Sequence, residues 1–189
     1  NGKDRVLISS PAANDARVIP AKRVSDGKDI FFDGADILEF DQNSGKWGLF
    51  FNADFMKTAI CHQSTGDVTV KSFNLDGFEW IKDATNKDQL LVSFEFAGCQ
   101  YLKLADNATV IYPGDLLVFT GTLGRDTAGT LSPYEGRSYQ GLGLAGTDNL
   151  LDFAVDPKGK LIARLAKSGV RGSDLMEFDT STKQWTRYF

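Results

Sequence analysis

Two segments of this chain share one pattern, and this repeat constrains the fold more than any other feature of the sequence. Residues 34–51, GADILEFDQNSGKWGLFF, align without a gap with residues 172–189, GSDLMEFDTSTKQWTRYF. Each segment runs through a short strand to an Asp, continues through a polar turn and returns with a Trp, as a β-hairpin does. Gly45 in the first turn corresponds to Lys183 in the second, so the two turns need not share one conformation. The repeat therefore predicts a duplicated hairpin and is silent about catalysis.

The rest of the chain also reads as short strands joined by turns. Strands are predicted at residues 67–73 and 89–98, as a pair within 108–121, and as four runs between 150 and 189. The pair within 108–121 is joined by Pro113-Gly114, a dipeptide that suits a type II turn. We therefore expect a single all-β domain over residues 1–189. Its architecture is expected to be an antiparallel sandwich or a barrel-like fold, built from hairpin meanders.

A small β-propeller is the alternative fold. The C-terminal segment 150–185 resembles a propeller blade, because it carries the DPxG and D-x-x-T-x-x-W hairpins that recur in blades. A propeller would repeat this pattern every ~40–50 residues. The middle of the chain does not show the repeat.

Two segments have more than one interpretation. Residues 52–63, NADFMKTAICHQ, fit either a short helix capped by Asn52 or a strand. Residues 121–147 are rich in Gly, Ser and Thr, and a structureless loop of that length is uncommon inside a compact domain. This segment is predicted to be a functional arm, or to contain strands that its sequence does not reveal.

The net charge limits which partners are expected, and the two cysteines bear on the cellular compartment. The net charge is −4 and the basic residues are scattered, which argues against a nucleic-acid partner. No apolar run approaches the ~18 residues of a spanning helix, so no membrane partner is expected. Cys61 and Cys99 either form a disulfide, which would imply an oxidising compartment, or remain buried free thiols.

No catalytic or metal-binding pattern stands out. GLGLAG at 141–146 matches G-x-G-x-x-G but is not flanked by the strand and helix of a dinucleotide site. His62 is the only histidine, and its neighbour Cys61 should point to the opposite face of a strand. Zinc-type ligand spacing is absent, and neither a metal nor a cofactor is expected. The glutamates that a carboxylate pair would draw on are Glu39, Glu79, Glu95, Glu135 and Glu177, beside many aspartates.

The segment SPYEGRSYQ at 132–140 is the candidate contact segment. Tyr134, Arg137 and Tyr139 are residue types that are enriched at binding surfaces. The alternative is a loop whose tyrosines fold back on the core. These three residues are the predicted binding residues.

Part of the sequence resembles head-decoration and related structural proteins of tailed phages. The residues that carry the resemblance are Pro113-Gly114-Asp115, between two hydrophobic strands, and the Gly-rich stretch at 141–146. The resemblance covers about a third of the chain. It implies a β-rich protein without an active site that clamps neighbouring capsid subunits.

Three functions follow from these observations. The first is a non-catalytic structural or interaction protein, extracellular or on a virion, whose partners are copies of itself or a major assembly subunit. The second is a secreted carbohydrate-binding module that uses exposed aromatic side chains as stacking platforms, namely Trp47, Trp80, Trp185, Tyr134 or Tyr139. The third is a glycoside hydrolase that uses two carboxylates facing one cleft. The first is the main prediction, and it makes the protein a non-enzyme.

Overall fold

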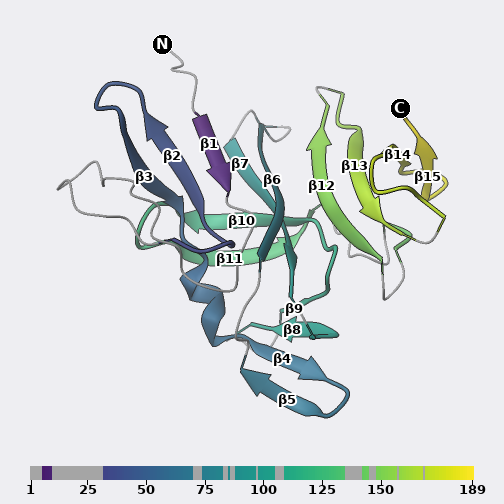
Figure 1. Cartoon of the computed structure of the whole chain (residues 1–189), viewed down its shortest axis with the longest axis horizontal. Coiled ribbons are helices and arrows are strands. Elements are labelled where there is room, and N and C mark those ends of the chain that lie inside the picture. The colour runs from purple at the N-terminus through teal and green to yellow at the C-terminus, as the bar shows by residue number, and fades with distance from the viewer. Residues whose placement is uncertain are drawn as a thin grey trace.

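A computed structural model of the chain describes residues 6–9, 32–69, 74–82, 85, 88–96, 98–104, 109–134, 142–144, 148–156, 158–167 and 169–189. These residues form four β-sheets, in which neighbouring strands run antiparallel, and one 3-10 helix. The prediction of an all-β antiparallel fold is confirmed. In Figure 1 the N-terminal strands lie on the left, the C-terminal strands on the right, and a small sheet at the bottom.

The central sheet separates two hydrophobic cores. It has the order β11-β10-β7-β6 and is formed by β6 (Asn74–Lys82), β7 (Asp88–Glu95), β10 (Leu117–Thr122) and β11 (Ala128–Pro133). Successive residues of a strand point to opposite faces. Leu90 and Val92 of β7 accordingly pack into the first core, whereas Leu91 packs into the second. The fold is therefore layered like a sandwich.

Two sheets contribute to the first core. The N-terminal sheet consists of β1 (Val6–Ser9), β2 (Ile37–Asp41) and β3 (Lys46–Phe51), in that order. The small sheet has the order β5-β4-β8-β9 and consists of β4 (Ile60–Gln63), β5 (Gly66–Thr69), β8 (Tyr101–Lys103) and β9 (Val110–Ile111). Ile37 from the N-terminal sheet and Leu102 from the small sheet are both buried in this core.

The C-terminal sheet covers the second core. It consists of β12 (Asn149–Val155), β13 (Leu161–Ala166), β14 (Leu175–Asp179) and β15 (Gln184–Arg187), in chain order. This meander is the arrangement that a propeller blade would have. The central and small sheets do not follow chain order, so the described part of the chain is not a regular array of blades. None of the described sheets closes into a barrel.

The segments 52–63 and 121–147, each of which had two interpretations, both contain regular structure. Asn52 caps the 3-10 helix η1 (Ala53–Thr58), and its side-chain oxygen accepts a hydrogen bond from the backbone N–H of Asp54 at 2.8 Å. Strand β4 follows directly, so the segment 52–63 is a helix and then a strand. The part of the candidate arm at 121–134 belongs to the β10–β11 hairpin, and Leu142 and Leu144 lie in the second core. Residues 135–141 and 145–147 lie outside the described residues.

The duplicated hairpins are present as predicted. Phe40 lies opposite Trp47 in one, and Phe178 lies opposite Trp185 in the other. The ring centroids are 5.0 Å apart in both pairs, with interplanar angles of 52° and 49°. The two copies therefore hold their aromatic pair in nearly the same geometry.

The two hairpin turns also share a left-handed residue at the same position. Gly45 has a φ of 66° and Lys183 a φ of 55°, so both residues are left-handed. In each turn the leading Asp accepts hydrogen bonds from residues that follow it, Asn43 and Ser44 after Asp41, and Ser181 and Thr182 after Asp179. The Asp holds the turn in both copies, even though a lysine occupies a position that favours glycine.

Candidate functional site

The structure describes one of the three predicted binding residues. Tyr134 is half-buried and packs against the second core, and its backbone N–H donates a hydrogen bond to the carbonyl of Leu116 at 2.8 Å. This is the alternative in which the tyrosine folds back on the core. Arg137 and Tyr139 lie outside the described residues.

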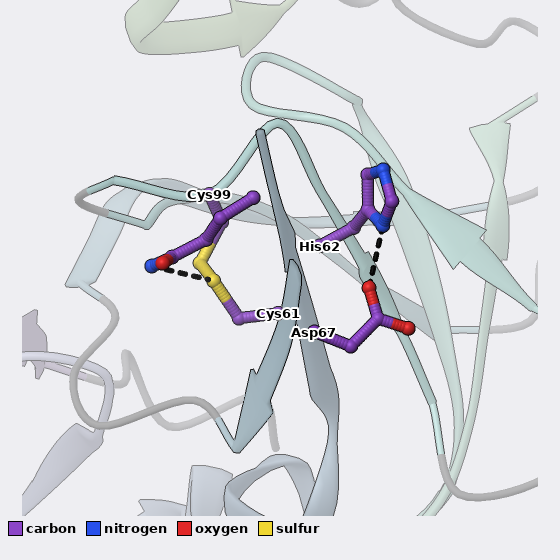
Figure 2. Close-up of a disulfide and its surroundings, with 5 residues drawn as sticks. Cys61, His62, Asp67 and Cys99 are labelled. Carbon is purple, nitrogen blue, oxygen red and sulfur yellow. Dashed lines mark hydrogen bonds and ion pairs between the residues drawn. A yellow bond between two sulfur atoms is a disulfide. The ribbon is translucent and has the colours of Figure 1, made fainter. Parts of the chain in front are cut away.

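Cys61 and Cys99 form a disulfide. It joins β4 to the segment before β8, across a sequence separation of 38 residues (Figure 2). Cys61 is buried in the first core, whereas His62 points to the other side of β4 (Figure 2). The two side chains do not form a couple, as strand alternation predicts.

His62 belongs to a polar and aromatic row on the outer face of the small sheet. Its Nδ1 lies 2.5 Å from a carboxylate oxygen of Asp67 (Figure 2), and its ring stacks on Tyr101 with the centroids 4.5 Å apart. Tyr112 continues the row, with its ring centroid 5.7 Å from that of Tyr101. Partners on both sides hold the imidazole in place, so this residue is a satisfied surface histidine.

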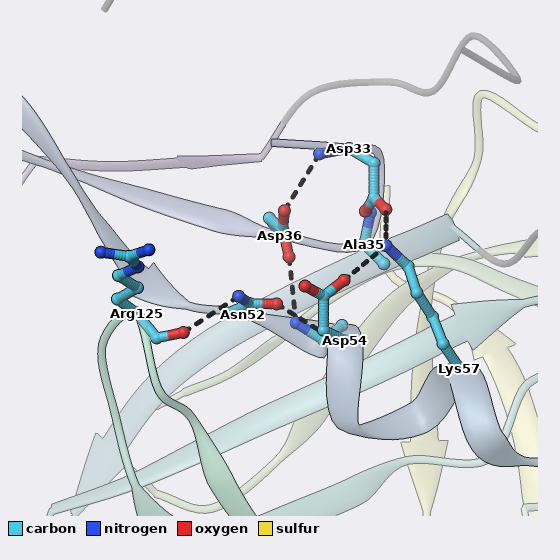
Figure 3. Close-up of polar contacts among 8 residues, drawn as sticks. Asp33, Ala35, Asp36, Asn52, Asp54, Lys57 and Arg125 are labelled. Carbon is cyan, nitrogen blue, oxygen red and sulfur yellow. Dashed lines mark hydrogen bonds and ion pairs between the residues drawn. The ribbon is translucent and has the colours of Figure 1, made fainter. Parts of the chain in front are cut away.

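Asp36 is a buried carboxylate that fastens η1 to the start of β2 (Figure 3). One of its oxygens accepts a hydrogen bond from the backbone N–H of Asp33 at 3.0 Å, and the other from the N–H of Ala53 at 2.9 Å. Burial raises the pKa of Asp36 to about 6. Both oxygens are already bound to backbone groups, so the residue joins elements and is poorly placed to act on a ligand.

Polar contacts near Asp36 also join η1 and its N-cap to the turn between β10 and β11 and to the segment before β2 (Figure 3). The side-chain amide of Asn52 donates a hydrogen bond to the carbonyl of Arg125 at 3.0 Å. The Lys57 ammonium pairs with the carboxylates of Asp33, at 3.1 Å, and of Asp54. The acidic residues of this region are thus used to hold the fold together.

Two further carboxyls lie between β6 and β12. A side-chain oxygen of Glu79 accepts a hydrogen bond from the backbone N–H of Val155, and Asp76 is hydrogen-bonded to the side chain of Asn149. Burial raises the pKa of both carboxyls, that of Asp76 to about 7. Oδ2 of Asp76, Oγ of Ser93 and Oδ1 of Asn149 are buried without a hydrogen-bond partner. Side chains of the central sheet therefore bind the edge of the C-terminal sheet.

The described residues offer little that resembles a catalytic centre. They contain no group of three His, Cys, Asp or Glu residues that would hold a metal ion. The three carboxyls with raised pKa, Asp36, Asp76 and Glu79, are all engaged in contacts between elements. In the described part of the chain, no helix has the length and apolar character needed to cross a bilayer.

An open groove of about 410 Å³ lies beside the first core. Its lining residues come from β6, β7, β10 and the residue after β10, and they are Trp80, Asp88, Gln89, Leu90, Phe119, Thr120, Gly121 and Leu123. Trp80 is half-buried, with the ring of Phe50 edge-on at 5.3 Å. Asp88 forms an ion pair with Lys82 at 2.6 Å beside it. A half-exposed aromatic ring and a charged pair thus meet in one groove.

The N-terminal sheet carries an apolar face that sequence reasoning missed. The face consists of two cross-strand rows, Val6–Phe40–Trp47 and Ile8–Leu38–Leu49, which we call the N-terminal face. Val6 is 42% exposed and Ile8 38% exposed, and Phe40, Trp47 and Leu49 are half-buried. Leu38 is buried at 1% exposure. Alternation along the strands predicts an apolar face, but the sequence does not show whether other elements of the fold cover that face.

The equivalent face of the C-terminal sheet is covered. Its residues are Leu161, Ala163, Met176 and Phe178, all buried in the second core, with Trp185 packed against them. Leu91 of the central sheet, together with Leu142 and Leu144, completes that core. Trp185 also donates a hydrogen bond from Nε1 to the carbonyl of Leu142 at 2.7 Å. The Phe of one hairpin is therefore buried inside the molecule, whereas the Phe of its duplicate is partly exposed to solvent.

Comparison of the chain with protein-family models, with curated proteins and with solved structures finds no match. Its geometry is therefore the evidence for its function. Three surfaces of the described residues could contact a ligand or partner: the N-terminal face, the groove beside Trp80 and the row at His62.

Proposed function

We propose that this chain is a non-catalytic interaction protein that assembles with further copies of itself through the N-terminal face. The observation that carries the proposal is the contrast between the two copies of one hairpin. Phe178 is 3% exposed because other elements cover its face, whereas Phe40 is half-exposed and Val6 beside it is 42% exposed. Exposed apolar surface of this kind marks interaction sites.

The position of β1 supports a homotypic contact. It is the edge strand of the N-terminal sheet, and β2 is the only described strand with which it pairs. Its sequence, VLIS, contains neither the charge nor the proline that commonly protect an edge from pairing. A two-fold axis that pairs β1 of two copies would continue the sheet and would bring Val6 and Ile8 of both copies together.

The disulfide supports an extracellular setting for this assembly. Disulfides persist in oxidising compartments and are rare in the cytosol. Together with the resemblance to phage head-decoration proteins, the Cys61–Cys99 bridge favours a secreted or virion-surface assembly. On a capsid, the major assembly subunit would be the neighbour.

Sedimentation velocity over a wide range of protein concentration tests the proposal. The wild-type chain should associate reversibly, and Val6→Lys should abolish association because it places a charge in the contact. Val68→Lys is the matched control, because Val68 is also 42% exposed but lies on β5 of the small sheet. A wild-type chain that stays monomeric, or equal association of the two variants, would overturn the proposal.

Carbohydrate binding is a second candidate, favoured by the groove beside Trp80. The groove volume of about 410 Å³ lies in the range of small-molecule sites, and an aromatic ring beside a carboxylate suits a sugar. Trp185 speaks less for it, since its ring packs against the second core and its indole N–H is bound to the carbonyl of Leu142. A glycan array followed by calorimetry tests it, and binding that survives both Trp80→Ala and Asp88→Asn would exclude this groove.

A further inference from the structure

We infer that the N-terminal face takes a turn-forming Leu-Gly-Leu segment of a partner chain, with a backbone carbonyl of that segment accepting a hydrogen bond from Nε1 of Trp47. The inference rests on the proposed function in that it uses the same face, and it adds the chemistry of the occupant. The molecule contains its own example of such a complex, because residues 142–144 are seated on the duplicate hairpin.

The internal example shows how the segment is held. Leu142 and Leu144 are buried in the second core, and the carbonyl of Leu142 accepts the hydrogen bond from Trp185 at 2.7 Å. The Lys167 ammonium donates a hydrogen bond to the carbonyl of Gly143 at 2.8 Å. A Leu-Gly-Leu segment is thus fixed by two apolar side chains and by hydrogen bonds to its backbone.

Glycine is required between the two leucines. Gly143 has a φ of 65°, and a Cβ added to it would lie 2.8 Å from the backbone oxygen of Lys183. The segment passes so close to the hairpin turn that any side chain at this position would displace the backbone. The described residues of the G-x-G-x-x-G match, 142–144, therefore pack against the β14–β15 hairpin.

The seat on the N-terminal sheet has the same shape. The Phe40–Trp47 pair repeats the Phe178–Trp185 pair in centroid distance and closely in angle. The left-handed residue of the turn, Gly45, repeats the conformation of its counterpart. A Cβ added to Gly45 would meet nothing within 4 Å, so this position could hold a side chain as Lys183 does.

The N-terminal seat is only partly covered among the described residues: Phe32 packs with Leu38, and Trp47 and Leu49 pack against this pair. Phe178 is buried, whereas Phe40 and Trp47 are half-exposed. Trp47 contacts the ring of Phe40 and packs against Phe32 and Leu38, whereas Trp185 donates its indole N–H to the carbonyl of Leu142. A buried indole usually has such a partner. An incoming segment with a free carbonyl would therefore complete this site as Leu142 completes the other one.

The sequence of the chain supplies the probe for a binding experiment. A synthetic peptide YQGLGLAGTD reproduces residues 139–148, and a control peptide YQGDGDAGTD replaces both leucines by Asp. Affinity is measured by fluorescence anisotropy of the labelled peptide. The site is identified from the indole N–H signals in ¹⁵N NMR, with Trp47→Phe assigning the Trp47 signal.

The leucine peptide should bind saturably and shift the indole signal of Trp47, and the Asp peptide should not bind. Trp47→Phe keeps an aromatic side chain but removes the indole N–H and part of the ring area, so it should weaken binding roughly three- to tenfold. Phe40→Lys should abolish binding, whereas Val68→Lys should leave it unchanged. Since Trp47→Phe is a mild change, the inference stays falsifiable even if Phe40→Lys fails to fold.

Three results would overturn the inference: no binding, equal binding of both peptides, or a shift confined to the indole of Trp185. The last result would mean that the peptide replaces the internal segment. Failure here is distinguishable from failure of the proposed function. If the chain self-associates but does not bind the peptide, the proposed function stands and this inference is wrong. If the chain is monomeric but binds the peptide, this inference stands and the proposed function is wrong.

Discussion

Replacing Asp76 by Asn should stabilise the protein at neutral and alkaline pH. Asp76 lies at a bulge of β6, where the pairing with β7 shifts between Leu75 and Gly77. Its Oδ2 is buried without a partner, and the negative charge of Glu95 raises its pKa further, in addition to burial. The charged form of this carboxyl is therefore disfavoured in the folded protein.

The direction of the pH dependence follows from the two pKa values. Asp76 titrates near 3.8 in the unfolded chain and near 7 in the folded protein, so the folded protein binds the proton more tightly between these values. Stability is then fully present below about pH 4 and is lost as the pH rises through 7. Each pKa unit corresponds to about 1.4 kcal/mol, so the loss amounts to at most about 4 kcal/mol. Partial solvation of the side chain reduces it to about 2–4 kcal/mol.

Urea unfolding at several pH values between 5 and 8 measures the effect. Asp76→Asn should gain about 2–4 kcal/mol over the wild type at pH 8 and roughly a third of that at pH 5, because the neutral amide carries no charge to bury. Asp126→Asn, at an exposed position in the β10–β11 hairpin, serves as the surface control. If the wild-type and Asp76→Asn curves run parallel, the reasoning about this carboxyl is wrong.

Three further changes test how the fold is held. Replacing Cys61 and Cys99 by Ser should lower the free energy of unfolding by about 4 kcal/mol, given the separation of 38 residues, and should abolish the sensitivity of the unfolding midpoint to reductant. Lys183→Gly should stabilise the protein by about 1 kcal/mol, because Lys183 has a left-handed φ of 55°. Gly45→Lys should destabilise it by a similar amount, because Gly45 has a φ of 66°. Melting temperatures of the two variants that shift in the same direction would contradict this. Asp36→Ala should cost about 2–4 kcal/mol, because it leaves buried backbone N–H groups unpaired, whereas a loss below 1 kcal/mol in urea unfolding would show that water replaces the carboxylate.

The fold was largely predictable from the sequence because the β signals are local. Alternation of apolar and polar residues and the turn residues mark β2, β3, β7 and the C-terminal meander, and the structure places strands at all of them. The 3-10 helix before β4 was the ambiguous element, because a helix turn and a short strand share apolar spacing over so few residues. The layering of the sheets depends on pairing between distant strands, such as β7 with β10, and local pattern does not encode it.

The candidate sites were less predictable, because they depend on which surfaces the folded chain leaves uncovered. Tyr134 was selected for its residue type; it is half-buried against the second core, and its role in binding stays a prediction. Cys61 and Cys99 were correctly considered as a pair, but spacing alone does not distinguish a disulfide from two buried thiols. The N-terminal face consists of ordinary strand residues, and its exposure is visible only once the other sheets are in place.

The duplicated hairpin separates the role of residue type from the role of surroundings. Phe40–Trp47 and Phe178–Trp185 have the same residues, the same pairing and nearly the same ring geometry. The C-terminal pair is part of a core because Leu91, Leu142 and Leu144 reach it. In the N-terminal sheet Phe32 packs with Leu38 and Trp47, and among the described residues Phe40 is still half-exposed. Apolar area that stabilises the fold in one copy is available for binding in the other, and both proposals follow from that difference.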